Sequence, residues 1–306
     1  MRRPVNEGTP FSFTDAERLG FTRWSLARAV QGDVLRRPLR GVYVDASVVD
    51  TRELRIACLR LVMPTYGVVC ERTAAWLYGI SGFSPDEQGL LTPEFAVPHH
   101  RGRSGHLPIR TVEAVLPAYA VAEVDGLPVT TPRRTATDLG RRLRRPMALA
   151  ALDAFAHSGQ VTRGELLADL ERWRGFPGVV QLRDLVRLIE PSAESPGESW
   201  LRLRLIDAGF PRPRAQIEVL DGSGRVFFRI DLGYDAERIG LEYDGREHHE
   251  GLRAMAHDEQ RRTLLRSEYG WNVYGFTAEH VLGRRTGLEM FVGGLLGVEP
   301  RLPRRW

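Results

Sequence analysis

Three acidic side chains stand close together in the stretch RIDLGYDAERIGLEYDGREHH, which runs from Arg229 to His249. Glu242 and Asp244 are separated by one residue, and Asp231 lies in the preceding apolar run. Carboxylates are costly to bury unless they are paired or bind a cation. Oxygen ligands of this kind suit Mg²⁺ or Mn²⁺, and such a site can polarise a phosphodiester and lower the pKa of a bound water. The cluster therefore favours a hydrolytic metal site.

Strand geometry indicates how the three carboxylates would meet. Side chains repeat every two residues along a strand, so Glu242 and Asp244 share one face. If the two runs pair through the turn at 235–237, Asp231 comes opposite residues 240–242. Like charges on one face would then repel each other unless a cation lies between them.

Structural roles are also open for these residues. Asp231 could cap the turn, and Glu242 could pair with an arginine of the neighbouring strand. Glu198 has the spacing of a capping box with Ser195, in which the glutamate returns a hydrogen bond to the cap. A capping role and a position beside the metal do not exclude one another, because the start of the helix can point at the metal.

Residues that could act on a phosphate follow the third strand. His248 and His249 come directly after the strand, where a side chain can reach a scissile phosphate as a general acid or base. An adjacent histidine pair is, however, more typical of a surface loop. On the next helix Arg261 is expected to point to phosphate, while Asp258 and Arg262, four residues apart, are most simply an intrahelical ion pair.

The elements around these residues follow a clear order. A helix that begins at Ser195 and ends at Gly209 is followed by a β-hairpin, a third strand, an amphipathic helix that Gly270 stops, and a fourth strand. The order is therefore α-β-β-β-α-β. The expected ranges are 195–210, 215–220, 225–234, 237–245, 251–270 and 271–276.

The first 50 residues have the pattern of a winged helix-turn-helix. A first helix is followed by a second one between Thr22 and Gly32, with Trp24 on its apolar face, and by a hairpin over 34–44. In that fold the second helix enters the major groove and the wing touches phosphate. The alternative is a small helical cap with solvated arginines. The residues expected to contact DNA are Arg23, Ser25 and Arg28 on the helix and Arg36, Arg37 and Arg40 on the wing.

The middle of the chain is expected to be a mixed α/β domain. Its segment 131–145 carries six arginines against one aspartate, which could bind a phosphate backbone but is more typical of a solvated helix face. Residues 189–199 (IEPSAESPGES) have the composition of a linker. The chain is therefore predicted to be a multi-domain α/β protein with domains at 1–50, 51–190 and 194–297.

The composition is that of a soluble globular protein from a reducing compartment. The 306 residues carry a formal net charge of +4, and all 43 basic residues are arginine. This excess lies before residue 195, because residues 195–306 hold 17 arginines and 17 acidic residues. With only Cys58 and Cys70, neither a disulfide framework nor a cysteine-built zinc site is expected. No apolar run is long enough to span a membrane, so a cytoplasmic protein is expected.

Five separated segments of the C-terminal part resemble one bacterial family. The segments ESPGES…LRLID, IDLGY, IGLEYDGREHH, DEQRRTLL and GWNVYGFTAEHV are similar to the very-short-patch-repair endonucleases of the PD-(D/E)XK superfamily. The resemblance covers residues 194–290 and implies a nuclease core that binds Mg²⁺ or Mn²⁺ through Asp231 and Glu242. The other site residues that it implies are Glu198, Asp244, His248, His249, Asp258 and Arg261.

The N-terminal part resembles AbiEi-type antitoxins of type IV toxin–antitoxin systems. The segments GFTRWSLARAV and LRGVYV resemble their winged-helix part, and CERTAAWLYGI and VTTPRRTATDL resemble the region that follows. This resemblance implies that DNA is a partner and that a toxin is a further one.

Two functions from different classes follow from these patterns. The first is a Mg²⁺-dependent DNA endonuclease that the winged helix delivers to DNA. The second is a non-catalytic regulator or antitoxin with a degenerate nuclease fold. Asp244 stands where the superfamily carries lysine. Gly275, which stands where an arginine is expected after the last strand, and the balanced charge of residues 195–306 favour the second function. The retained carboxylates favour the first, and a toxin that cleaves RNA is a third alternative.

Overall fold

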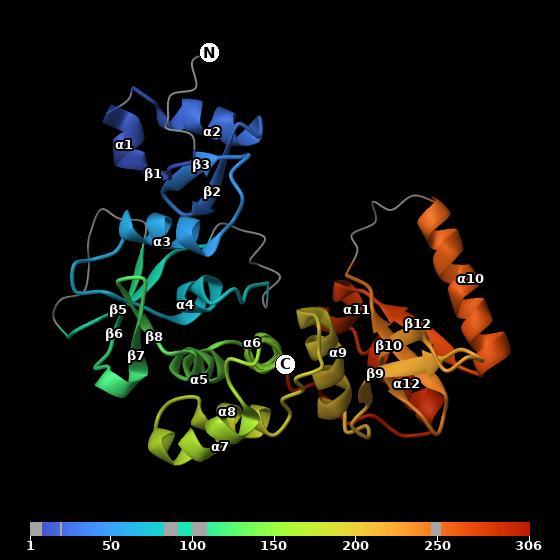
Figure 1. The fold of residues 1–306 in the computed structure, drawn as a ribbon. Helices are drawn as coiled ribbons and strands as arrows, with labels where there is room; N and C mark the ends of the chain where they lie inside the picture. The colour runs from blue at the N-terminus through green and yellow to red at the C-terminus, as the bar shows by residue number, and fades with distance from the viewer. Residues whose placement is uncertain (1–7, 19, 83–90, 100–108, 246–251) are drawn as a thin grey trace. The chain divides into compact units, whose positions relative to one another are not determined.

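The chain is shown in Figure 1 as a computed structural model, which describes residues 8–18, 20–82, 91–99, 109–245 and 252–306. It divides into two compact units, unit 1 (residues 1–139) and unit 2 (residues 140–306), and each is described by itself. This division falls inside the predicted domain 51–190, and the division into three domains stays a prediction. Both units combine helices with sheets, as expected for an α/β chain. Within the described ranges, no helix has the length and apolar character needed to cross a bilayer.

Unit 1 begins with two helices and a hairpin, in the predicted order. Thr22 caps the second helix: its side chain accepts a hydrogen bond from the Ser25 N–H, and the Ser25 hydroxyl accepts one from the Thr22 N–H. The helices and the sheet β1-β3-β2 bury a small core around Phe11, Leu26 and Leu35. Its identification as a winged helix stays a prediction. The elements are β1 (Phe11–Ser12), α1 (Phe13–Arg18), α2 (Arg23–Gln31), β2 (Leu35–Leu39) and β3 (Val42–Asp45).

The rest of unit 1 is built on a mixed sheet with the strand order β6-β5-β4-β8-β7. Strand β4 runs antiparallel to β5 and parallel to β8. Leu59, Phe95 and Val129 belong to one buried core that joins the helices to this sheet. The elements are α3 (Arg52–Arg60), β4 (Val68–Val69), α4 (Glu71–Leu77), β5 (Glu94–Val97), β6 (Arg110–Glu113), a 3-10 helix (Ala118–Ala120), β7 (Val121–Val124) and β8 (Leu127–Thr130).

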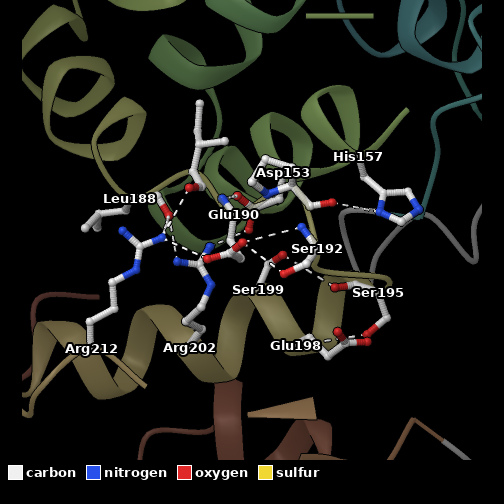
Figure 2. Close-up of polar contacts among 12 residues, drawn as sticks. Asp153, His157, Leu188, Glu190, Ser192, Ser195, Glu198, Ser199, Arg202 and Arg212 are labelled. Atoms are coloured by element: carbon white, nitrogen blue, oxygen red, sulfur yellow. Dashed lines mark hydrogen bonds and ion pairs between the residues drawn. The ribbon is translucent and has the colours of Figure 1, made fainter. Parts of the chain in front are cut away.

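A buried ion pair joins the first helices of unit 2. Asp153 on α6 and Arg202 on α9 lie 2.6 Å apart (Oδ2 to Nη2), and both side chains are buried (Figure 2). Breaking such a pair by removing one partner is costly, because a buried charge is left without compensation. The elements are α5 (Pro132–Arg142), whose residues fall in both units, α6 (Arg145–His157), α7 (Arg163–Asp169), a 3-10 helix (Leu170–Trp173), α8 (Val179–Val186) and α9 (Pro196–Asp207).

Residues 189–199, whose composition predicts a linker, are held by several hydrogen bonds (Figure 2). The Glu190 N–H donates to Asp153 Oδ1 at 2.9 Å. Arg212 donates to the carbonyl oxygen of Leu188 at 3.3 Å and pairs with the Glu190 carboxylate at 3.2 Å. The linker prediction is therefore wrong: this segment is an ordered part of unit 2, fixed by charged partners that are distant in the sequence.

The second half of unit 2 has the predicted element order α-β-β-β-α-β. Its sheet has the strand order β12-β11-β10-β9; β10 pairs antiparallel with both β9 and β11, and β12 runs parallel to β11. Figure 1 shows α9 and α10 on opposite sides of this sheet. Assignment of this order to the PD-(D/E)XK superfamily stays a prediction. The elements are β9 (Arg214–Leu220), β10 (Val226–Tyr234), β11 (Ile239–Tyr243), α10 (Leu252–Tyr269), β12 (Asn272–Phe276), α11 (Ala278–Leu282) and α12 (Gly287–Leu296).

Candidate functional site

Strands β10 and β11 part at the two carboxylates that the sequence analysis singles out. The pairing of the two strands extends from Tyr234 to Leu232 on β10, and Leu232 lies opposite Leu241. Asp231 and Glu242 are the next residues beyond this last pair. The charge of Glu242 acts on the pKa of Asp231, so the two carboxylates lie near each other where the strands part. Their joint role in a site stays a prediction.

Asp231 lies in an unfavourable environment for a negative charge. Burial and the nearby charge of Glu198 raise the pKa of Asp231 to about 7, and Glu242 adds to the effect. The Tyr243 N–H, which donates to Asp231 Oδ2 at 3.0 Å, and the charge of Arg261 act in the opposite direction. The carboxyl group is therefore about half protonated near pH 7 in the absence of a cation that compensates for its charge.

Glu198 joins this cluster from the first turn of α9. Ser195 caps the helix, because its hydroxyl accepts the Glu198 N–H at 3.2 Å (Figure 2). The second half of the predicted capping box is wrong: the Glu198 carboxylate accepts the N–H of Glu194, at 3.1 Å, and not that of Ser195. The Glu198 side chain is buried, and its negative charge raises the pKa of Asp231.

Gln216 is a site residue that the sequence analysis missed. Its Nε2 donates to Glu198 Oε2 at 2.8 Å and so holds the carboxylate in place. Its backbone φ of +51° lies in the left-handed region, which is unfavourable for a residue other than glycine. The sequence carries no signal for this role of Gln216. Its contact with Glu198 depends on how β9 packs beside α9, which local patterns do not determine.

Two arginines of α10 face Glu242. Arg261 Nη2 lies 2.9 Å from Glu242 Oε2, and Arg262 Nη2 lies 4.0 Å from the same oxygen. The guanidinium of Arg261 also lies 4.4 Å from the centre of the Phe228 ring. Arg261 was expected to point to phosphate, whereas in the structure it is paired with the Glu242 carboxylate.

The guanidinium of Arg262 lies close to Gly275. Gly275 on β12 is paired with Glu242 in the parallel register of β11 and β12. A Cβ atom at Gly275 would lie 2.7 Å from Arg262 Nη2. A guanidinium from α10 therefore occupies the space above Gly275, the position at which an arginine was expected.

The remaining predicted residues stand apart from this cluster or outside the described chain. Asp244 is exposed at the end of β11, and its N–H donates to the Phe276 carbonyl at 2.8 Å. Its carboxylate is not among the charges that shift the pKa of Asp231. His248 and His249 lie outside the described residues, as does the side chain of Asp258.

The carboxylates can be tested against the requirements of a metal ion. In the part of the chain that the structure describes, no group of three or more His, Cys, Asp or Glu side chains could hold a metal ion. Mg²⁺, however, commonly keeps several waters and is bound through one or two carboxylates. Asp231 and Glu242 would supply two neighbouring carboxylates, provided that Glu242 leaves Arg261. Only then would these two side chains fit a hydrated Mg²⁺ or Mn²⁺.

The predicted DNA-contacting residues of unit 1 fall into two sets. Arg23, Arg37 and Arg40 line one hollow of about 510 Å³ between α1, α2 and the hairpin. Arg28 lies on the exposed side of α2, where its guanidinium is 4.8 Å from the centre of the Trp24 ring. Trp24 is 67% exposed, so its predicted place on the apolar face is wrong.

Two further residues that were predicted to contact DNA form hydrogen bonds within unit 1. Arg36 Nη2 donates to the carbonyl of Val48 at 2.8 Å, so this arginine is folded back on the chain. The Ser25 hydroxyl takes part in the cap of α2 with Thr22. The hollow and the exposed side of α2 are therefore the surfaces of unit 1 that present arginine and aromatic side chains together.

Three arginines of the segment 131–145 have partners within the protein, and Arg142 and Arg144 are exposed. Arg134 pairs with Asp138 at 2.6 Å. In unit 2, Arg145 pairs with Asp207 at 2.7 Å, and the buried Arg141 lies 4.2 Å from the centre of the Trp173 ring. Composition could not reveal this, because the acidic and aromatic partners of unit 2 are distant in the sequence.

Comparison with known proteins gives two findings. The sequence model of the AbiEi antitoxin C-terminal domain matches residues 67–188. The expected AbiEi resemblance is thus present, with its match on the middle of the chain. Two Mycobacterium tuberculosis proteins, "Uncharacterized protein MT2308" of strain CDC 1551 / Oshkosh and "Uncharacterized protein Rv2248" of strain ATCC 25618 / H37Rv, are each 34% identical over 260 residues. The alignment covers 85% of this chain and 92% of each relative.

Proposed function

We propose that this chain, which belongs to the same family as the Mycobacterium tuberculosis proteins MT2308 and Rv2248, acts on DNA and hydrolyses phosphodiester bonds with its C-terminal half. Its AbiEi antitoxin domain at residues 67–188 supports a toxin–antitoxin or DNA-binding role. The hydrolytic activity is the further step, and it is argued from the carboxylate cluster.

The convergence of Glu198, Asp231 and Glu242 is the observation that carries the proposal. The pKa of Asp231 is raised to about 7 because the carboxyl is buried beside other negative charges. A divalent cation between Asp231 and Glu242 would compensate for these charges and allow Asp231 to ionise. A purely structural cluster would gain more from an apolar residue at position 231, since a buried carboxyl without full compensation is destabilising.

The neighbouring side chains have distinct roles in this proposal. Mg²⁺ or Mn²⁺, when bound by Asp231 and Glu242, would polarise a phosphodiester and acidify a water molecule. Glu198, held by Gln216 Nε2 at 2.8 Å, is placed to accept a proton or orient a water. Arg262 supplies a positive charge near Glu242. This charge would take the place of the lysine of the resembled superfamily, since this chain has Asp244 at the lysine position.

Unit 1 would provide the affinity for DNA. Arg23, Arg37 and Arg40 surround one hollow, and Arg28 lies beside the exposed Trp24. Arginines that contact phosphate oxygens bring most of the affinity for DNA without determining its sequence. Residues 195–306 hold equal numbers of arginines and acidic residues. The C-terminal half would therefore rely on unit 1 to bind DNA.

A cleavage assay tests the proposal. The full chain is incubated with plasmid, linear and mismatched DNA in the presence of Mg²⁺ or Mn²⁺, alongside Asp231→Asn and Glu242→Gln. The matched control is Glu218→Gln, an exposed carboxylate on β9 of the same sheet. Metal-dependent cutting that only the control retains is the expected result. Absence of cutting with either metal, while DNA is still bound, would reject the hydrolase.

A second candidate function rests on the ion pair between Arg261 and Glu242. Their separation of 2.9 Å shows that Glu242 can be neutralised without a metal. The chain would then be a non-catalytic DNA-binding regulator or antitoxin whose partner is a toxin. Sequence-specific DNA binding together with copurification of a toxin, and no cutting, is the outcome that this candidate predicts.

A further inference from the structure

A hollow of about 770 Å³ lies beside the carboxylate cluster. It is formed by α10, β12, α11 and the start of α12, and is called the β12 pocket here. Its volume is in the range of roughly 300–1,000 Å³ that is typical of small-ligand sites. The residues that line it include Arg262, Arg266, Tyr274, Phe276, Arg284 and Phe291.

One side of the β12 pocket is aromatic. The rings of Tyr274 and Phe291 meet edge to face, with centroids 5.0 Å apart and an interplanar angle of 80°. Phe276 lies behind them, with its ring centroid 6.2 Å from that of Phe291. Phe291 is 44% exposed. The exposed ring offers a surface on which a planar group can stack.

The rim of the pocket is positively charged. Arg266, Arg284 and Arg285 line it, and none of them forms an ion pair with a residue in the described part of unit 2. Glu279 is the only acidic residue among the lining residues that the structure describes. Arginine and an aromatic face together recognise a planar ring that carries a phosphate.

The pocket adjoins the carboxylate cluster through two shared residues. Gly275 and Arg262 line the pocket. Gly275 is also the register partner of Glu242, and Arg262 Nη2 lies 4.0 Å from a Glu242 oxygen. A nucleotide in the pocket would therefore lie next to Glu242, one of the two residues proposed to hold the metal.

We propose that the β12 pocket binds an unpaired nucleotide, with its base against Phe291 and Tyr274 and its phosphate at Arg266 and Arg284. Stacking on an aromatic side chain needs the base to leave its duplex partner, which is the general chemistry of single-strand recognition. The binding site itself does not depend on hydrolysis. Its consequence, a preference for cutting beside an unpaired nucleotide, rests on the proposed function.

Binding is measured first, by isothermal titration calorimetry of the full chain without divalent cation. 2′-Deoxyuridine 5′-monophosphate and uridine 5′-monophosphate, which differ only in the 2′-hydroxyl, are the nucleotide probes, and inorganic phosphate is the comparison. Saturable binding of a nucleotide that is at least about tenfold tighter than phosphate is expected, because the base adds a stacking contact. The ratio of the two nucleotide affinities distinguishes a DNA from an RNA ligand. Nucleotide binding no tighter than phosphate binding would overturn the proposal.

Variants locate the binding. Phe291→Ala should weaken nucleotide binding about tenfold and leave phosphate binding unchanged. Arg266→Ala should weaken both ligands. Met290→Ala and Arg163→Ala are matched controls, because these exposed residues of unit 2 do not line the pocket. Equal losses in Phe291→Ala and Met290→Ala would overturn the assignment, and a circular-dichroism melting curve for each variant excludes a folding defect as the cause.

Cleavage then separates this proposal from the hydrolase. Duplex DNA with one unpaired nucleotide should be cut at least about fivefold faster than the fully paired duplex, and Phe291→Ala should remove the difference. Nucleotide binding that persists in Asp231→Asn while no substrate is cut would reject the hydrolase alone. Cutting that shows no preference, together with no nucleotide binding, would reject the β12 pocket alone.

Discussion

Glu242 and Gly275 are register partners on the parallel strands β11 and β12, and the glycine leaves space for a guanidinium beside the carboxylate. This relationship determines how position 275 responds to substitution. A Cβ at Gly275 would lie 2.7 Å from Arg262 Nη2, which is the far end of a flexible side chain and can move.

Two glycine substitutions should therefore differ in their effect on stability. Gly275→Ala is expected to lower the free energy of unfolding by less than about 1 kcal/mol, since only the Arg262 side chain must shift. Gly197→Ala would place its Cβ against the Tyr243 ring, which packs edge to face on Trp200. Its expected cost is about 3 kcal/mol. Urea denaturation of both variants measures the difference, and similar losses would contradict the packing described.

Removal of the Asp231 charge should stabilise the protein in a pH-dependent way. The pKa of this carboxyl is about 7 in the folded chain and about 3.9 in an unfolded one. The folded state therefore binds the proton more tightly, and its stability falls as the pH rises from about 4 to about 7. Asp231→Asn should be more stable than the natural chain at pH 8, by up to about 4 kcal/mol, and equally stable at pH 4.

Urea unfolding at the two pH values checks this expectation in the absence of divalent cations. Glu218→Gln is the control, because Glu218 is exposed on the same sheet. A difference between Asp231→Asn and the natural chain that is the same at pH 4 and pH 8 would show that the Asp231 carboxyl does not titrate as described.

Removal of the Arg261 charge should strengthen binding of a divalent cation. Arg261 Nη2 and the cation compete for Glu242, whose Oε2 lies 2.9 Å from the guanidinium. Breaking a partly exposed ion pair of about 1 kcal/mol would tighten Mn²⁺ binding about fivefold in Arg261→Gln. Titration of Mn²⁺ followed by electron paramagnetic resonance measures the affinity. Unchanged or weaker binding would count against a metal at Glu242.

Arginines of unit 1 should differ in their contribution to DNA affinity. Arg23→Ala and Arg28→Ala are expected to weaken DNA binding and to reduce its dependence on salt by about one phosphate contact each. Arg36→Ala is the matched control, because its Nη2 is already engaged with the Val48 carbonyl at 2.8 Å. Fluorescence anisotropy at several salt concentrations distinguishes the three, and an equal loss in Arg36→Ala would contradict the assignment.

Local patterns predicted the elements of the site well, whereas contacts between distant segments were beyond them. Apolar patterns, turns and caps predicted the order of helices and strands, and the predicted hairpin brings Asp231 near Glu242. Gln216 was missed because its contact with Glu198 joins β9 to α9. The role of Arg262 was missed because the space above Gly275 depends on how α10 packs on β12.

The ion pair between Asp153 and Arg202 has a consequence for how this chain can be recombined. Asp153 lies within the segment matched by the AbiEi domain, and Arg202 lies in the segment that resembles a nuclease. Transplanting residues 194–297 alone would remove Asp153 and the Leu188 carbonyl, and would expose the face of α9 that packs on α6. We therefore expect related proteins to carry the two segments together, with Asp153 and Arg202 either both present or both replaced.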